Sequence, residues 1–403
     1  MTSSGSTAQR ATPRAALRVV LGVVVVDLIG FGIVMPILPF MVKERGAGDS
    51  SGIWVGLLLS GYAAAQFLFA PLWGRLSDRV GRRRVMLCTI AGTAFSLFLF
   101  ALGGSLGWLL ATRILAGAFA ANVSVASAYI ADATDESERT RWMGLIGAAF
   151  GIGFLLGPAL AGGLSPLGYR VPLFVAAGLA ALNWGHAAVR LPETQRHKSL
   201  AARPRRSMLA EPSVRWLCLS NLVFALSVTQ LETVFQLFLI ERFHYAAWQV
   251  ALLMVAMASV MATVQGGGMR ALAARFPERR LVWVGSLAMA GCFVAVPEIH
   301  TIGLLLVVLA LSAIGRAVIQ PSLLSLTSQS ADPSDRGAVM GAFQSAASLA
   351  RVFGPFAAGW LYDHALATPF WLAGALAVAL SLLASTLPAR ESTAAAAAPA
   401  AGS

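Results

Sequence analysis

Long runs of apolar residues, each broken by glycine, proline or charge, fill most of the chain. A helix needs about 20 apolar residues to cross a bilayer, and lipid offers no hydrogen-bond partner to a backbone that is not helical. The pattern therefore predicts an all-α integral membrane protein with twelve transmembrane helices. We expect them at residues 17–42, 53–73, 84–104, 107–131, 141–164, 170–190, 214–240, 248–269, 281–298, 301–327, 337–362 and 367–388.

Composition agrees with this prediction. Of the 403 residues, 57% are hydrophobic and only 12% are charged, whereas about a quarter of the residues of a soluble domain carry charge. The three cysteines lie inside apolar runs without metal-ligand spacing, and no phosphate-binding GxxxxGK[ST] motif is present. These features argue against an enzyme, a metal site and a cofactor, so the energy for any transport must come from an ion gradient.

The chain is basic, with 30 Lys and Arg against 18 Asp and Glu. Basic residues that bind nucleic acid gather on one patch, but here they fall in alternate loops, which is the pattern that orients a membrane protein. Placing the N-terminus in the cytoplasm leaves only Lys43, Arg45, Arg170 and Arg242 in outer loops. The charge therefore predicts cytoplasmic termini and no nucleic-acid partner.

An internal repeat divides the chain into two halves. Arg139, Met143-Gly144, Gly157-Pro158 and Ala161-Gly162 recur at a constant offset as Arg336, Met340-Gly341, Gly354-Pro355 and Ala358-Gly359. We predict a cytoplasmic N-tail at 1–16, a six-helix bundle at 17–190, a basic cytoplasmic linker at 191–213, a second six-helix bundle at 214–388 and a disordered, alanine-rich tail at 389–403. Parallel repeats of this kind are known in secondary transporters, with the binding site between the halves.

The loop after the second predicted span reads Gly74-Arg-Leu-Ser-Asp78-Arg79-Val-Gly81-Arg82-Arg83-Arg84. It resembles the signature of the major facilitator superfamily at this loop, which is G, three residues, then D-R-x-G-R-R. The glycines suit a tight turn. An ordinary positive-inside loop would explain the arginines but not the aspartate and the two glycines at these spacings. The resemblance implies two pseudo-symmetric six-helix bundles and a conformational latch formed by Gly74, Asp78, Arg79, Gly81, Arg82 and Arg83.

The fifth predicted span carries Gly144, Gly153, Gly157, Pro158 and Gly162. It resembles the glycine-rich helix 5 of the drug/proton antiporters in this superfamily, where it implies a hinge between states. Small residues also let helices pack closely in any membrane protein, so two interpretations remain open, a hinge and plain packing.

The first span contains Asp27, Gly30, Gly32 and Met35-Pro36-Ile-Leu-Pro39, a pattern similar to the first helix of tetracycline/proton antiporters. A carboxylate inside an apolar span is costly to keep charged and is by default functional. Asp27 is therefore a candidate proton carrier; the alternative is permanent pairing with an arginine.

In the fold that the resemblance implies, helices 1, 4, 7 and 10 line a central cavity, and each carries one charge here. We assign proton coupling to Asp27, Glu232, Arg113 and Arg316. Judged by depth within the spans, we expect Asp27 to face Arg316 and Arg113 to face Glu232.

The same cavity would bind a small lipophilic substrate, and a cationic or zwitterionic lipophile suits an acidic site in an apolar cavity. Polar candidates for its lining are Asn122, Ser124, Gln230, Gln236, Gln320, Tyr62 and Gln66. Tetracycline pumps carry further aspartates on helices 3 and 9, where this chain has Ser96 and Met289, which argues against tetracycline itself.

The resemblance thus predicts a monomeric, proton-driven exporter of lipophilic drugs in the bacterial inner membrane, surrounded by lipid. Alternatives on the same fold are a proton-coupled metabolite symporter, a lipid flippase and a non-transporting sensor.

Overall fold

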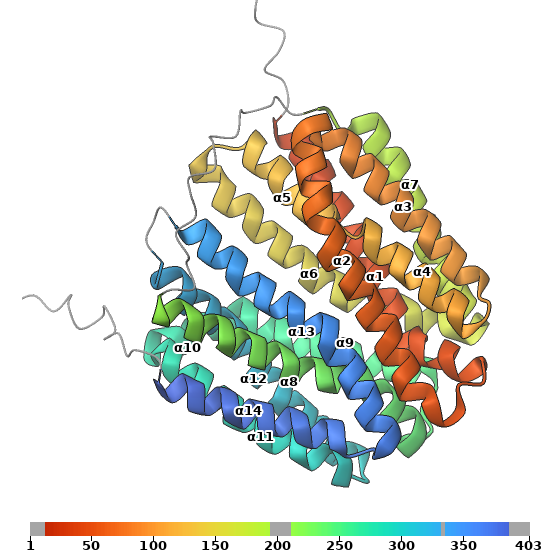
Figure 1. The fold of residues 1–403 in the computed structure, drawn as a ribbon, viewed down its shortest axis with the longest axis vertical. Coiled ribbons are helices and arrows are strands. Elements are labelled where there is room, and N and C mark those ends of the chain that lie inside the picture. The colour runs from red at the N-terminus through yellow and green to blue at the C-terminus, as the bar shows by residue number, and fades with distance from the viewer. Residues whose placement is uncertain (1–12, 194–210, 332–334, 387–403) are drawn as a thin grey trace, which may run out of the picture. The chain divides into compact units, whose positions relative to one another are not determined.

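The computed structural model describes residues 13–193, 211–331 and 335–386, and within them the chain is a series of helices joined by short loops (Figure 1). The predicted tail 389–403, most of the predicted linker 191–213 and most of the N-tail 1–16 lie outside these residues. The first repeat supplies α1 Pro13–Glu44, α2 Ser51–Val80, α3 Arg82–Leu102, α4 Leu106–Phe119, α5 Asn122–Ala133, α6 Glu136–Leu164 and α7 Arg170–Arg190. The second supplies α8 Pro212–Phe243, α9 Ala247–Thr263, α10 Met269–Arg275, α11 Glu278–Ala295, α12 Ile302–Gln329, α13 Arg336–His364 and α14 Thr368–Thr386.

The predicted all-α membrane fold is confirmed, with two local differences. Eleven helical segments of the described chain are long and apolar enough to cross a membrane. The fourth predicted span is not one helix but α4 and α5, separated at residues 120–121. The eighth continues beyond its expected end through a π-helical stretch, Val264–Gly268, into α10. Helix α13 is long enough to cross a membrane but is not among these eleven segments. It carries the charged residue Arg351 in its interior.

The helices form two compact units. The described residues of unit 1 fall within Met1–Gly48, Gly61–Ala201 and Tyr245–Val255, and those of unit 2 within Asp49–Ser60, Ala202–His244 and Ala256–Ser403. The first turns of α2 thus group with unit 2, and the first turns of α9 with unit 1. The bundle boundaries expected at 17–190 and 214–388 stay a prediction.

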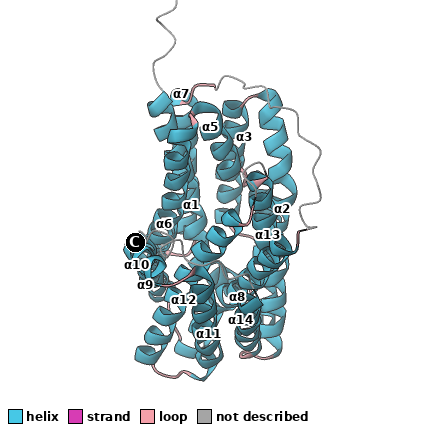
Figure 2. Ribbon diagram, turned by 90° about the vertical axis from the view of Figure 1, so that its left-hand side faces the viewer, coloured by secondary structure: helices cyan, strands magenta, loops and turns pink. Residues whose placement is uncertain are grey.

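Each unit is built by the same internal packing. In unit 1, α1 packs against α6 and α7, and α3 packs against α7 and α4. In unit 2, the helices at the equivalent places of the repeat do the same: α8 packs against α13 and α14, and α11 against α14 and α12. Figure 2 shows α1, α3 and α7 of unit 1 as long helices running in similar directions. A repeated sequence has therefore produced a repeated fold.

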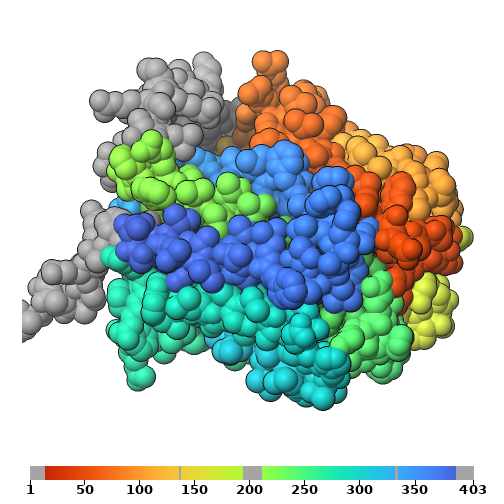
Figure 3. All heavy atoms as spheres, turned by 60° about the horizontal axis from the view of Figure 1, so that its bottom comes forward, coloured from red at the N-terminus to blue at the C-terminus, as the bar shows by residue number. Residues whose placement is uncertain are grey.

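Large apolar side chains cover much of the outer surface of the helices. On α14, which runs beside α11 on the face seen in Figure 3, Trp371, Val378 and Leu382 are all exposed. Large exposed apolar patches are rare on monomeric soluble proteins. Such a surface suits helices surrounded by lipid, in agreement with the composition.

Small residues bring α1 and α6 into close contact inside unit 1. A Cβ atom added to Gly157 would lie 2.6 Å from the Cα of Gly32, and one added to Gly32 would lie 2.6 Å from the carbonyl oxygen of Gly153. Pro158 lies in the continuous helix α6 beside the same contact. By contrast, Gly144 has open space around it, and Gly162 faces Ala251 and Trp248 at the start of α9. The glycines of α6 therefore serve packing at three of these positions, and their role as a hinge stays a prediction.

We expect Gly157→Ala to destabilise the protein by about 1–3 kcal/mol, because the added methyl group meets backbone that cannot move aside cheaply. The control is Gly163→Ala on the same helix, where a Cβ has open space and alanine favours the helix. Thermal unfolding of the purified variants in detergent measures the difference. Equal melting temperatures would show that the α1–α6 contact is not close-packed.

Candidate functional site

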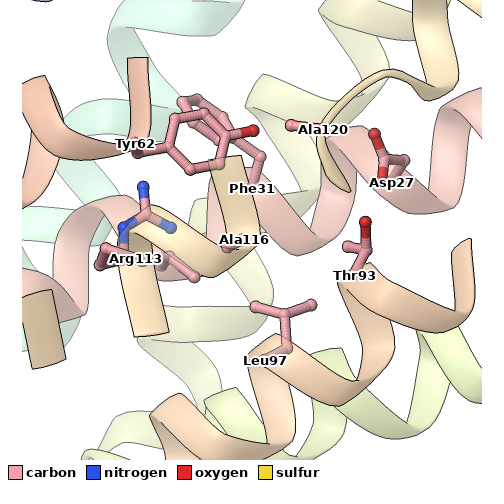
Figure 4. A pocket seen from close by; sticks show the side chains of 9 residues that line it. Asp27, Phe31, Tyr62, Thr93, Leu97, Arg113, Ala116 and Ala120 are labelled. Carbon is pink, nitrogen blue, oxygen red and sulfur yellow. The ribbon is translucent and has the colours of Figure 1, made fainter. Parts of the chain in front are cut away.

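A small cavity with polar and apolar walls lies inside unit 1 among α1, α2, α3 and α4. Asp27, Tyr62, Thr93 and Arg113 supply its polar groups, as Figure 4 shows. The apolar part of the lining consists of Phe31, Val34, Leu97, Ala116 and Ala120. The structure therefore brings together three residues that the sequence singled out, Asp27, Tyr62 and Arg113.

The carboxyl group of Asp27 is held by a short hydrogen-bonded chain. Nδ2 of Asn122 donates to Oδ1 of Asp27 over 2.8 Å, and the Thr89 hydroxyl donates to Oδ1 of Asn122 over 2.5 Å. Asn122 and Thr89 are buried. Their hydrogen bonds fix the orientation of the amide, so that its NH₂ group faces Asp27. Asn122 was expected in the substrate cavity, and Thr89 was not singled out by the sequence.

The break between α4 and α5 places Asn122 at the start of a helix. At the break the N–H of Ala121 donates to the carbonyl of Phe119 over 2.8 Å instead of one turn back. Side chains of α2 bind two of the carbonyls beside the break. Nε1 of Trp73 donates to the carbonyl of Ala118, and Nε2 of Gln66 donates to the carbonyl of Ala120. Irregular backbone inside a membrane requires such partners. Gln66, expected to contact substrate, instead stabilises the break.

Arg113 lies in the cavity against aromatic rings rather than against an acid. Its guanidinium carbon is 4.4 Å from the centroid of the Tyr62 ring and 5.9 Å from that of Phe100. The residue is only 3% exposed, and its Nε and Nη2 donate no hydrogen bond to any described group. Cation–π contact compensates part of the cost of burying the charge, and the free N–H groups remain available to an acceptor.

The cavity has a volume of about 30 Å³. A water molecule needs roughly 10–15 Å³ of such space, whereas drug-binding pockets measure roughly 300–1,000 Å³. The cavity can therefore hold water beside Asp27, Thr93 and Arg113 but not a drug. It suits the transfer of a proton to or from Asp27 better than substrate binding.

Glu232 and Arg316 form an ion pair within unit 2, from α8 to α12. Their side chains are 42% and 19% exposed, respectively. We expected Arg113 to face Glu232 and Arg316 to face Asp27, and the structure gives each of these groups a different partner. Depth along a span indicates height in the membrane but not direction around the helix, and α8 and α12 are neighbours in one unit.

The remaining cavity candidates fall into separate environments. Nε2 of Gln230 donates to the carbonyl of Gly354 over 3.2 Å, and the Ser124 hydroxyl donates to the carbonyl of Ala121 over 2.8 Å. Gln236 is buried, whereas Gln320 is exposed. Gln230 and Ser124 thus bind backbone carbonyls of their own unit.

Arg82 organises the loop between α2 and α3. Its guanidinium contacts Asp78 at 2.7 Å, Asp132 at 2.8 Å and the Ser77 hydroxyl at 2.6 Å. Asp78, expected to be the main residue of the latch, is 56% exposed and forms an ion pair with this arginine one turn away. Gly81 has φ of +115°, as the expected tight turn requires, but Gly74 lies within α2 and not in a turn.

Glu193, which the sequence analysis did not single out, closes the same loop. Its carboxylate accepts a hydrogen bond from the backbone N–H of Arg83 over 3.0 Å, in the first turn of α3 where helix N–H groups lack partners. Nη2 of Arg83 donates to the carbonyl of Ala188 at the end of α7. No motif marks Glu193, because it is 110 residues from Arg83 in sequence.

Comparison with known proteins agrees with this architecture. The sequence model of the Major Facilitator Superfamily matches residues 20–270 and 268–403. The chain belongs to the major facilitator superfamily. It is therefore a multi-pass membrane transporter and not an enzyme.

Its relatives include drug-resistance proteins. The chain is 32% identical to the class D tetracycline resistance protein of Salmonella ordonez, covering 86% of this chain and 89% of the relative. It is also 32% identical to the class C protein of Escherichia coli, covering 91% and 95%. The crystal structure of the human organic anion transporter MFSD10 (TETRAN) matches with a TM-score of 0.68 at 26% identity, covering 93% and 100%. The predicted resemblance to tetracycline/proton antiporters is confirmed.

We expect Arg82→Lys to destabilise the loop by about 1–3 kcal/mol, because lysine cannot contact two carboxylates and a hydroxyl at once. Limited trypsin digestion should then cut faster after Arg79, with a lower melting temperature. Arg84→Lys, at the exposed neighbouring position, is the matched control. Unchanged cleavage in Arg82→Lys would contradict the organising role of Arg82.

Proposed function

We propose that this transporter exports lipophilic drugs or related small molecules in exchange for protons, by alternating access. The observation that carries the proposal is Asp27, a carboxyl group in an apolar span that borders a water-sized cavity and accepts a hydrogen bond from Asn122. A group that exchanges protons must be reachable by water and must change charge at moderate energetic cost. The similarity to tetracycline resistance proteins supports the direction of transport.

The other charged groups of the spans have distinct proposed roles. Arg113 lies in the same cavity as Asp27, and we propose that it is the cationic group of the proton-coupling site. Glu232, paired with Arg316, is the proposed coupling group of unit 2, where protonation would release the arginine. We further propose that Asp78 and Arg82 are part of a cytoplasmic latch, and that both termini lie in the cytoplasm of a bacterial cell, with the protein a monomer in the inner membrane.

Tetracycline itself is a weaker candidate substrate. Ser96 and Met289 replace the aspartates that we expect of tetracycline pumps, and both side chains are buried. The Ser96 hydroxyl donates to the carbonyl of Thr93 over 2.9 Å, so its hydrogen bond is made within its own helix. A related apolar drug remains the proposed cargo.

An organic anion is the second candidate. Arg113 has buried N–H groups without an acceptor among the described residues, and the human relative with 26% identity is an organic anion transporter. An anion that reached Arg113 would accept these hydrogen bonds.

Everted membrane vesicles energised by respiration distinguish these candidates. We expect proton release from the vesicle lumen when a lipophilic cation or zwitterion is added, and none with tetracycline. Proton release or uptake only with organic anions would favour the second candidate. No response to any compound in either panel, combined with unchanged drug tolerance on deletion, would contradict both.

Replacing Asp27 by Asn should abolish substrate-driven proton movement while leaving membrane insertion intact, because the amide is similar in size but does not titrate. Asp49→Asn, at an exposed position in the short 3-10 turn before α2, is the control and should behave as the unchanged protein. The measurement is the pH signal inside the vesicles at matched expression. Full proton-coupled transport in Asp27→Asn would remove Asp27 from the mechanism.

A further inference from the structure

Two arginine side chains converge at one end of unit 1, where α1 and α3 end and α7 begins. Arg45 follows α1, and Arg170 is the first residue of α7. A Cβ atom built on Gly103, the residue that caps α3, would collide with Nη2 of Arg45 and lie 3.1 Å from Nη2 of Arg170. Both guanidinium groups therefore crowd the space that the missing side chain of Gly103 leaves open.

The two arginines lack an acidic partner within the described ranges, where neither forms an ion pair with a carboxylate. Nε and Nη2 of Arg45 are buried and donate no hydrogen bond to any described group. Buried N–H groups without acceptors are costly, and a second positive charge beside them adds repulsion. An anion between the two guanidinium groups would remove both costs.

The helix ends at this place carry partial charges of both signs. Arg170 lies at the N-terminus of α7, where the helix dipole is positive and favours an anion over a cation. Helices α1 and α3 end here, and their C-termini are negative. In the part of the chain that the structure describes, Nε and Nη2 of Arg45 donate no hydrogen bond to the carbonyls at these ends, so these N–H groups still lack an acceptor.

An exposed aromatic pair lies one helical turn deeper in the membrane. Phe98 precedes the end of α3 at Leu102 by four residues, and Phe174 follows Arg170 by four residues. Residues four apart share one face of a helix. The two rings are 6.0 Å apart between centroids in an edge-to-face arrangement, and they are 46% and 40% exposed. A molecule that placed an anionic group at the arginines would find an apolar surface directly below it.

We propose that this corner of unit 1 binds the phosphate group of an anionic phospholipid, with Arg45 and Arg170 on the phosphate and the acyl chain along Phe98 and Phe174. Guanidinium groups bind phosphate oxygens through paired hydrogen bonds. The aromatic pair favours a lipid over a free phosphate ion, because a free ion would gain nothing from it.

Native mass spectrometry of the full chain, solubilised with phosphatidylglycerol or with phosphatidylcholine, tests this site. We expect retained phosphatidylglycerol, with retention reduced about tenfold in Arg45→Gln/Arg170→Gln. Arg170→Gln alone changes only an exposed position. A loss of lipid retention in this variant would therefore not be due to misfolding of the protein interior. The matched control is Arg242→Gln, which removes another arginine near a helix end, in contact with His300.

Thermal unfolding distinguishes binding of a lipid from binding of a free phosphate ion. Phosphatidylglycerol should raise the melting temperature of the unchanged protein and of Arg242→Gln, but not of the double variant, and inorganic phosphate should have no effect. Stabilisation by inorganic phosphate without retained lipid would overturn the lipid assignment. Equal retention of phosphatidylglycerol by the double variant would overturn the site.

Discussion

A carboxyl group in an apolar helix is the constraint on which the rest of unit 1 depends. Asp27 can remain there only if polar groups meet it, and Asn122 provides one at 2.8 Å. Asn122 is available because α4 ends and α5 begins beside it, and that break is possible because side chains of α2 bind the carbonyls it leaves free. One buried acid thus accounts for the irregular fourth span, the polar face of α2 and the water-sized cavity between them.

The position of this carboxyl group is linked to the close contact between α1 and α6. Gly32, just over one turn beyond Asp27, packs against Gly153 and Gly157 with no room for a side chain. A displacement of α6 would therefore move α1 and with it Asp27 relative to Asn122 and Arg113. The proposed transport cycle needs such coupling between a bundle movement and the environment of the proposed proton carrier. In unit 2, Glu232 and Arg316 form an ion pair between two neighbouring helices.

Much of the fold was predictable from the sequence, because the hydrophobic runs, the repeat and the loop at Gly74–Arg84 each carry their own signal. Four charged residues inside apolar spans could also be singled out from the sequence: Asp27, Arg113, Glu232 and Arg316. Their partners could not, since hydropathy and depth contain no information on which face of a helix turns toward which neighbour. Hence Glu232 binds Arg316, and Arg82 rather than Asp78 organises the loop. The break at 120–121 was missed because no proline or charge marks it, and Glu193 because it is distant in sequence from the turn that it caps.

In the proposed mechanism, Asp27 takes up and releases a proton while it remains inside the protein. Infrared difference spectroscopy of the purified transporter, recorded across a pH titration, tests this most directly. We predict a carboxylic-acid C=O band that appears as the pH falls, shifts when substrate is added and is absent from Asp27→Asn. A spectrum in which the same pH-dependent band persists in Asp27→Asn, or in which substrate leaves it unchanged, would contradict the account.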